Sequence, residues 1–198
     1  MIVFNDPQIP DRTAYILDND KPNPLPEMTS VVLWLERAGA DFIAIPCNTA
    51  HYFYEQIAAS ATVPVLNIMR ETTARIVEMH GEHATIGLLA TDGTLSSGVF
   101  QSYLSDAGLS VMAPSEEDQR DIVMPLIYDR VKRNLPYDPT AFLDLARRMH
   151  ENGCDAVIVG CTELSVVYQD LVQKPDYLID SMDVLADRCV SYYLERHR

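Results

Sequence analysis

The chain has 198 residues, of which 47% are hydrophobic, and this length allows one domain or two small ones with real apolar cores. Fifteen Lys and Arg residues against 29 Asp and Glu residues give a net charge of −14, which argues against nucleic acid or an anionic membrane surface as the main partner. No apolar run reaches membrane-spanning length, and the four cysteines lack the spacing of a metal cluster or a disulfide framework. We therefore expect a globular protein with free thiols in the cytoplasm.

The first predicted elements are a helix and a strand that lead to a cysteine. Residues 31–38 have helical periodicity and end at Gly39, which we expect to occupy the left-handed position after the helix. The apolar residues after Asp41 predict a strand that leads to Cys47. Residues 64–67 predict a further short strand, which leads into another helical segment.

The second half of the chain begins with a strand over residues 84–90, a loop from Thr91 to Thr94 and a helix through about Leu104. Residues 109–114 predict the next strand. Residues 142–149 predict a helix that ends at Gly153, and the apolar residues 156–159 then lead to Cys161. Residues 177–180 predict the last strand.

These two halves are an internal duplication. Residues 39–47 and 153–161 align without a gap, and each has Asp two residues and Cys eight residues after its Gly. Right-handed crossovers place both cysteines at carboxyl ends of parallel strands, where open α/β sheets bind ligands. We therefore expect an α/β fold of two pseudo-symmetric, doubly wound, parallel-sheet domains with the active site between them, formed by residues 1–81 plus 179–198 and by residues 82–178.

The duplication is incomplete at its start. Residues 109–114 parallel residues 2–7, but the first half has no counterpart of the strand at 84–90 and its helix. We expect the first half to begin at its second strand, without the strand that is normally central in a doubly wound sheet.

The two duplicated cysteines are candidate acid/base groups. The strand-to-helix turn places each near a helix N-terminus, which favours the reactive thiolate. One thiolate and one thiol on opposite faces of a carbon can invert a stereocentre without a cofactor. For one such cysteine alone the plainer interpretation is a buried core residue, as we expect for Cys154 and Cys189.

Polar residues beside these cysteines are candidate substrate ligands. Donors for a carboxylate are expected from Asn48 and Thr49 in the first half, and from Thr162 with the backbone at Glu163 in the second. His51 could tune Cys47 or only pack against it, with packing slightly favoured. Cys47 and His51 are too few ligands for zinc, and we expect no metal site.

Two motifs carry a family resemblance. Residues 45–51 read Ile-Pro-Cys-Asn-Thr-Ala-His and residues 160–164 read Gly-Cys-Thr-Glu-Leu, which resemble the paired motifs of the aspartate/glutamate racemase family. The second motif, with Glu163 after the Thr, resembles the aspartate racemase branch. The resemblance implies a cofactor-independent racemase of an acidic amino acid, aspartate in preference to glutamate, and a homodimer.

The same resemblance assigns further residues. It implies that Arg12 faces the side-chain carboxylate of the substrate, that Lys132 reaches the same place, and that the loop with Thr91 and Thr94 lines the active site. The alternatives are a solvated turn for Arg12, a wet basic helix face for Lys132 and an ordinary capped turn for the loop.

Two other functions remain open from the sequence. A related isomerase or decarboxylase would keep the fold and use one or both thiols. The incomplete first half also suggests a catalytically impaired, truncated remnant or a subunit that serves a partner.

Overall fold

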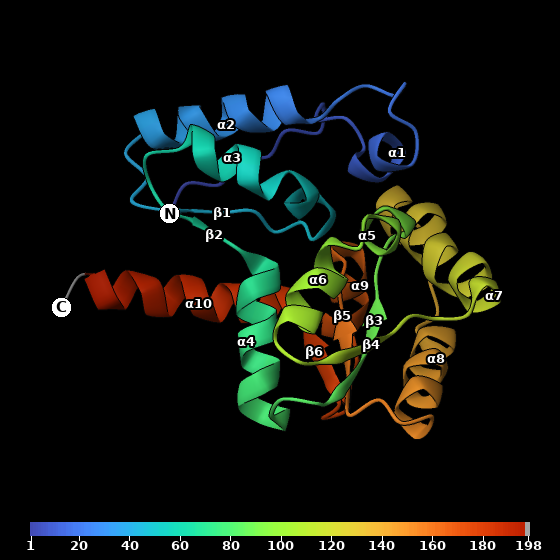
Figure 1. Ribbon diagram of the computed structural model, residues 1–198. Coiled ribbons are helices and arrows are strands. Elements are labelled where there is room, and N and C mark those ends of the chain that lie inside the picture. Colours follow the sequence, from blue (N-terminus) through green and yellow to red (C-terminus); the bar gives the residue numbers. More distant parts are fainter. Residues whose placement is uncertain (197–198) are drawn as a thin grey trace.

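The computed structural model describes residues 1–196 and confirms the α/β fold with parallel sheets (Figure 1). Its larger sheet has four parallel strands in the order β4-β3-β5-β6. These strands are β3 (Thr85–Leu89), β4 (Ser110–Met112), β5 (Ala156–Val159) and β6 (Leu178–Asp180). All four residues of β5 are buried, because helices cover both faces of the sheet.

Successive residues of the central strands point to opposite faces, and each face has its own apolar core. Ile86, Leu88 and Ile158 pack against α4 (Ile68–His80), α6 (Val99–Asp106) and α10 (Ser181–Arg196). The opposite face packs against α8 (Thr140–Glu151), α9 (Thr162–Gln169) and the helical turns η2 (Gln119–Val123), η3 (Leu126–Arg130) and η4 (Val131–Arg133), which follow α7 (Glu116–Asp118). The second half is therefore doubly wound, as expected.

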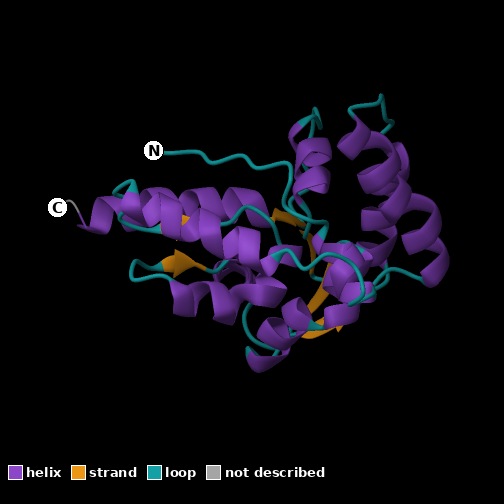
Figure 2. Cartoon of the chain, turned by 90° about the horizontal axis from the view of Figure 1, so that it is seen from above, coloured by secondary structure: helices purple, strands orange, loops and turns teal. Residues whose placement is uncertain are grey.

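The first half is built around two short parallel strands, β1 (Ile43–Ala44) and β2 (Val65–Leu66). Their core packs against α2 (Leu25–Arg37), η1 (Thr49–Phe53) and α3 (Tyr54–Ser60), and α1 (Arg12–Leu17) lies toward the second half (Figure 1). The long helix α10 reaches back beneath β1, where the rings of Tyr192 and Phe42 lie 5.1 Å apart. Figure 2 shows both ends of the chain on this side of the molecule.

The internal duplication is visible in the backbone. Gly39 and Gly153 have φ values of 89° and 104°, the left-handed conformation that was expected after each helix. Ala40 N donates to Leu35 O and Cys154 N donates to Met149 O, both at 3.1 Å, so α2 and α8 end in the same Schellman motif. The predicted helix through Leu104 is interrupted at Gly98, where φ is 65°, and forms α5 (Asp92–Ser97) and α6.

One predicted strand is wrong. Residues 2–7 form no strand, whereas their counterpart in the second half forms β4 by pairing with β3. Within residues 1–196, the first sheet contains only β1 and β2, so residues 2–4 have no strand beside them to share hydrogen bonds. Phe4 instead packs edge-on against Trp34, with ring centroids 4.9 Å apart. The domain boundary at residue 179 stays a prediction, and it falls within β6.

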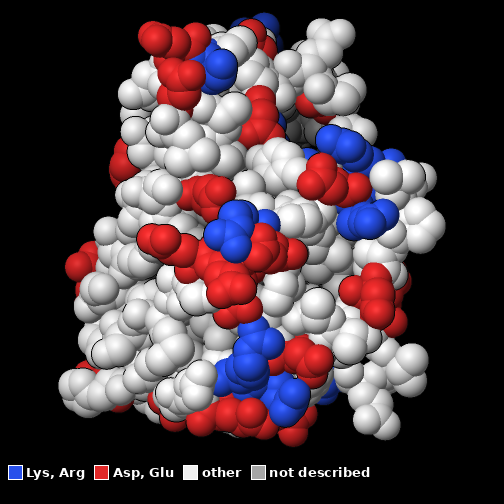
Figure 3. Space-filling view, turned by 90° about the vertical axis from the view of Figure 1, so that its right-hand side faces the viewer, with Lys and Arg blue, Asp and Glu red and all other residues white. Residues whose placement is uncertain are grey.

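Charge on the surface is mixed in sign. Figure 3 views the molecule from the side of α7 and α8 and shows groups of Lys and Arg side chains bordered by Asp and Glu. Ion pairs such as Arg148–Asp118 and Arg147–Asp144 account for part of this pattern. None of the helices formed by residues 1–196 combines the length and apolar character needed to cross a membrane.

Candidate active site

A cavity of about 220 Å³ lies where the two halves of the chain meet. It collects both duplicated cysteines and every predicted substrate-binding residue except Thr94. The lining consists of Asp11, Arg12, Thr13, Pro46, Cys47, Asn48, Thr49, Thr91, Tyr128, Lys132, Cys161, Thr162 and Glu163. The volume is below the range of about 300–1,000 Å³ that is usual for drug-sized ligands, and thiol, hydroxyl, carboxylate and basic side chains line it.

Cys47 follows β1, and the side chain of His51 contacts its backbone. His51 Nδ1 lies 2.9 Å from the carbonyl oxygen of Cys47, and Ile68 N donates to Nε2 at 3.2 Å. Because Nε2 accepts from an N–H, the proton is on Nδ1 and is donated to Cys47. Burial lowers the pKa of His51 to about 4, so the ring is neutral at pH 7. His51 therefore positions the backbone of Cys47 through a hydrogen bond.

Cys161 occupies the N-cap position of α9 and is only 5% exposed. Its Sγ donates to Glu163 Oε2 at 2.9 Å. Burial, then the negative charge of Glu163 and this hydrogen bond, raise the pKa of Cys161 well above its ordinary value. Cys161 is therefore a protonated thiol in this state of the site.

In both halves, the residue four positions after the cysteine contacts the carbonyl oxygen of that cysteine. Ser165 Oγ lies 3.2 Å from the carbonyl oxygen of Cys161, as His51 contacts that of Cys47. Ser165 Oγ lies 2.6 Å from Asp180, the last residue of β6, and His51 accepts from Ile68 N, which begins α4 directly after β2. Both thiols thus stand on a turn that is fixed to the neighbouring strand.

Three buried threonine hydroxyls join the halves beside Cys47. Thr49 Oγ1 lies 2.9 Å from Thr91 Oγ1 and 3.0 Å from Thr94 Oγ1, and Thr91 and Thr94 are 3.2 Å apart. Thr91 and Thr49 line the cavity, whereas Thr94 lies outside the cavity and is hydrogen-bonded to both. On the opposite side, Thr162 Oγ1 donates to Pro46 O at 2.6 Å. The two cysteine turns are therefore hydrogen-bonded across the boundary between the halves.

Asn48 lines the cavity and is 1% exposed. The sequence suggested it as a donor to a carboxylate, but its Nδ2 already donates to Ser181 Oγ at 3.0 Å, and Ser181 donates to Val159 O. Its Oδ1 has no hydrogen-bond partner within residues 1–196. Asn48 therefore ties the turn after Cys47 to the start of α10, and its amide nitrogen keeps a second N–H.

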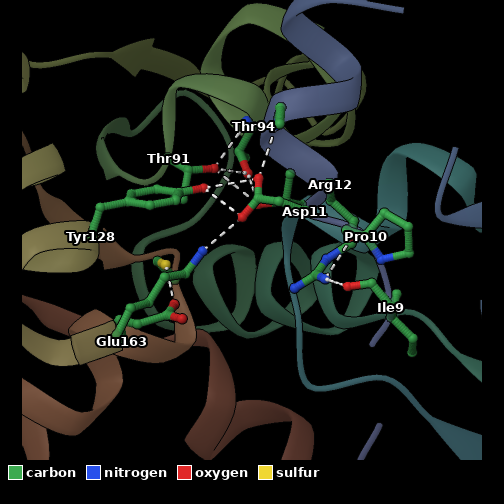
Figure 4. Close-up of polar contacts among 12 residues, drawn as sticks. Ile9, Pro10, Asp11, Arg12, Thr91, Thr94, Tyr128 and Glu163 are labelled. Atoms are coloured by element: carbon green, nitrogen blue, oxygen red, sulfur yellow. Dashed lines mark hydrogen bonds and ion pairs between the residues drawn. The ribbon is translucent and has the colours of Figure 1, made fainter. Parts of the chain in front are cut away.

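Asp11 and Tyr128 line the cavity together with Lys132, although the sequence did not predict them as site residues. Asp11 caps α1 and binds Lys132, with Lys132 Nζ 3.0 Å from Asp11 Oδ2. Tyr128 OH donates to the same carboxylate at 3.1 Å, and Figure 4 shows Asp11 facing Tyr128. Two signals were available: Tyr128 precedes Lys132 by one helical turn, and Asp11 precedes a helix start.

Arg12 is beside Cys47 and turns one nitrogen back to its own chain. Nη1 donates to Pro10 O at 2.9 Å and Ile9 O at 3.3 Å (Figure 4). Burial lowers the pKa of Arg12, but the opposite charges of Cys47 and Asp11 outweigh burial and raise it. Arg12 is therefore a cation within reach of both a thiol and the cavity.

A glycine allows α1 to carry these residues into the site. A Cβ at Gly93 would lie 2.7 Å from Thr13 Cα and 2.8 Å from Thr13 Oγ1, which is closer than real contacts permit. Position 93 must therefore be a glycine for α1 to pack against α5. Within residues 1–196, no three His, Cys, Asp or Glu side chains are grouped so that they could hold a metal ion.

The fold and the site define an α/β protein with two duplicated thiols in one small polar cavity. The model of the Asp/Glu/hydantoin racemase family matches residues 1–189. The chain belongs to this family and is an amino-acid racemase of it.

Individual relatives agree with this assignment. A broad specificity amino-acid racemase, RacX of Bacillus subtilis, is 33% identical over 160 residues, which are 81% of this chain and 68% of that protein. The aspartate racemase of Picrophilus torridus superposes with a TM-score of 0.78 at 25% identity, over 96% of this chain and 78% of that one. The glutamate racemase of Francisella tularensis, solved with D-glutamate, shares the fold with a TM-score of 0.63 at 16% identity, over 98% of this chain and 69% of that one.

Proposed function

We propose that this chain racemises an acidic amino acid, aspartate in preference to glutamate, at Cα by a two-thiol acid/base mechanism without a cofactor. The observation that carries the proposal is that Cys47 and Cys161, from equivalent positions of the duplication, line one cavity of about 220 Å³. A substrate held between them presents opposite faces of Cα to the two sulfur atoms, which is the arrangement that inversion requires.

The surroundings of the two thiols differ, and this difference supports separate starting roles. Cys161 is protonated beside Glu163 and is the acid, while Cys47, beside Arg12, is the base. Cys47 takes the Cα proton as its S–H bond forms, and Cys161 gives its proton to the other face of the same carbon. This leaves Cys47 as the thiol and Cys161 as the thiolate, so in the reverse direction Cys161 takes the Cα proton and Cys47 gives its own proton to the opposite face.

The remaining polar groups give the substrate one orientation. Arg12 and Lys132 bind the side-chain carboxylate, and the hydroxyls of Thr49 and Thr91 with the backbone N–H groups at Thr162 and Glu163 bind the α-carboxylate. Thr94 positions Thr49 and Thr91. The second N–H of Asn48 is a further donor for the α-carboxylate.

The test follows the optical rotation of L- and D-aspartate, then of L- and D-glutamate, with the wild-type chain. We expect Cys47→Ser and Cys161→Ser each to abolish racemisation in both directions, because either direction needs both thiols. Cys154→Ser, a buried thiol outside the cavity, is the matched control and should keep its activity. Near-normal turnover by Cys47→Ser would overturn the mechanism.

Isotope exchange separates the racemase from its relatives. A racemase incorporates deuterium from D₂O at Cα of the inverted product with retention of every carboxylate. Release of carbon dioxide would instead identify a decarboxylase.

We also propose that the protein is a homodimer. Light scattering, which measures the molar mass in solution, would test this.

A further inference from the structure

Four charged side chains line the cavity, and they are not equally available to a substrate. Two are basic, Arg12 and Lys132, and two are acidic, Asp11 and Glu163. Lys132 is ion-paired with Asp11, whereas within residues 1–196 Arg12 forms no ion pair with a carboxylate. The part of the cavity that is lined by Asp11, Arg12 and Lys132 therefore has two cations and one anion, and a net charge of one.

The Asp11–Lys132 pair is fixed before any substrate arrives. Asp11 Oδ1 accepts from Ala14 N at 2.8 Å, so the carboxylate cannot leave without uncapping α1. Tyr128 OH donates to both oxygens at 3.1 Å, and its ring lies under the ammonium group of Lys132 at 3.7 Å. The Asp11 and Lys132 side chains are 35% and 27% exposed, so both contact the cavity.

We propose that Asp11 is a specificity-determining residue, because it cancels the charge of Lys132 and admits substrates whose side chains lack a carboxylate. The proposal rests on the racemase function proposed above and assigns its range of substrates. An acidic side chain must share Lys132 with Asp11. A neutral side chain of the same length, such as that of asparagine, meets an ion pair that is already complete.

The charges give an ordered expectation for the preference between aspartate and asparagine, measured as the ratio of their kcat/KM values. The net charge of Asp11, Arg12 and Lys132 together is one in the wild type, two in Asp11→Asn and zero in Lys132→Gln. It returns to one in the double variant. Asp11→Asn should therefore raise the ratio about tenfold, roughly the effect of one unit charge a few ångströms away. Lys132→Gln should lower it, and the double variant should lie near the wild type.

The substitution is suited to the structure. Asn caps a helix as well as Asp does, so Asp11→Asn keeps the bond from Ala14 N and removes only the charge. Asp118→Asn breaks a comparable ion pair, with Arg148, outside the cavity and is the matched control. It should leave the ratio unchanged. Far-ultraviolet circular dichroism establishes that each variant is folded.

The outcomes separate this proposal from the proposed function. A folded wild-type chain that racemises no amino acid would overturn the racemase function itself. Racemase activity with no turnover of asparagine would overturn the role of Asp11, as would an Asp11→Asn ratio that is unchanged or lower. A double variant that keeps the full effect of Asp11→Asn would show that Asp11 does not act through Lys132.

Discussion

The Sγ atom of Cys161 lies 2.9 Å from Oε2 of Glu163, so a buried thiol and a carboxylate share one proton at the wall of the cavity. Charging both groups at once is unfavourable, because like charges this close repel in a buried site. The thiol therefore keeps its proton until a reaction partner removes it.

Replacing this carboxylate should move the titration of Cys161. In Glu163→Gln the charge that raises the pKa of Cys161 is gone while burial remains, so the pKa falls but stays above its ordinary value. The pH profile of Cys161 alkylation, resolved by mass spectrometry, should shift to lower pH, and kcat should fall about tenfold or more. Glu117→Gln on the exposed surface of α7 should change neither. An unmoved profile would separate Glu163 from the thiol.

His51 makes stability depend on pH. Its folded pKa, about 4, is below the value of about 6.5 in the unfolded chain, so the unfolded state binds more protons between these values. The free energy of unfolding should therefore fall as pH falls from 6.5 to 4, by about 3 kcal/mol from this residue. Urea unfolding at several pH values measures the slope. His51→Gln should flatten it in this window, and an equal slope in the variant would contradict the assignment.

The threonine cluster should respond to loss of a single hydroxyl. Thr94→Val keeps the shape of the side chain but leaves Thr49 and Thr91 without one partner each, which should lower the free energy of unfolding by about 1 kcal/mol and raise KM severalfold. Thr73→Val is the matched control, because Thr73 Oγ1 is buried with no partner in residues 1–196. It should not lose stability. Equal effects of the two substitutions would show that the cluster contributes nothing specific.

Gly93 should tolerate no side chain. Gly93→Ala places a Cβ against Thr13, so α1 must move away from α5 together with Asp11 and Arg12. We expect the unfolding free energy to fall by about 1–3 kcal/mol and kcat/KM to fall with it. Ser96→Ala, at an exposed position of the same helix, should have little effect on either. If Gly93→Ala had wild-type thermal stability and kinetics, α1 could move away from the added Cβ without loss of stability or activity, and the prediction would be wrong.

The sequence by itself determined the parts of this protein that repeat. The spacing of Gly39 to Cys47 and of Gly153 to Cys161 is local, and helix ends and strand periodicity follow from nearby residues alone. The parallel α/β fold and the Schellman glycines could therefore be predicted. The same logic failed for residues 2–7, because a strand exists only where another strand supplies its hydrogen bonds.

Only the tertiary structure decided how the polar groups of the site are paired. Asp11 and Lys132 are 121 residues apart, and Asn48 and Ser181 are 133 apart, so no local pattern announces either contact. A polar side chain can donate or accept in several directions, and the choice is made by whichever partner the fold brings within about 3 Å. For that reason the sequence identified Lys132 and Asn48 as ligands, but the fold decided that Asp11 already binds the first and that Ser181 already accepts a hydrogen bond from the second.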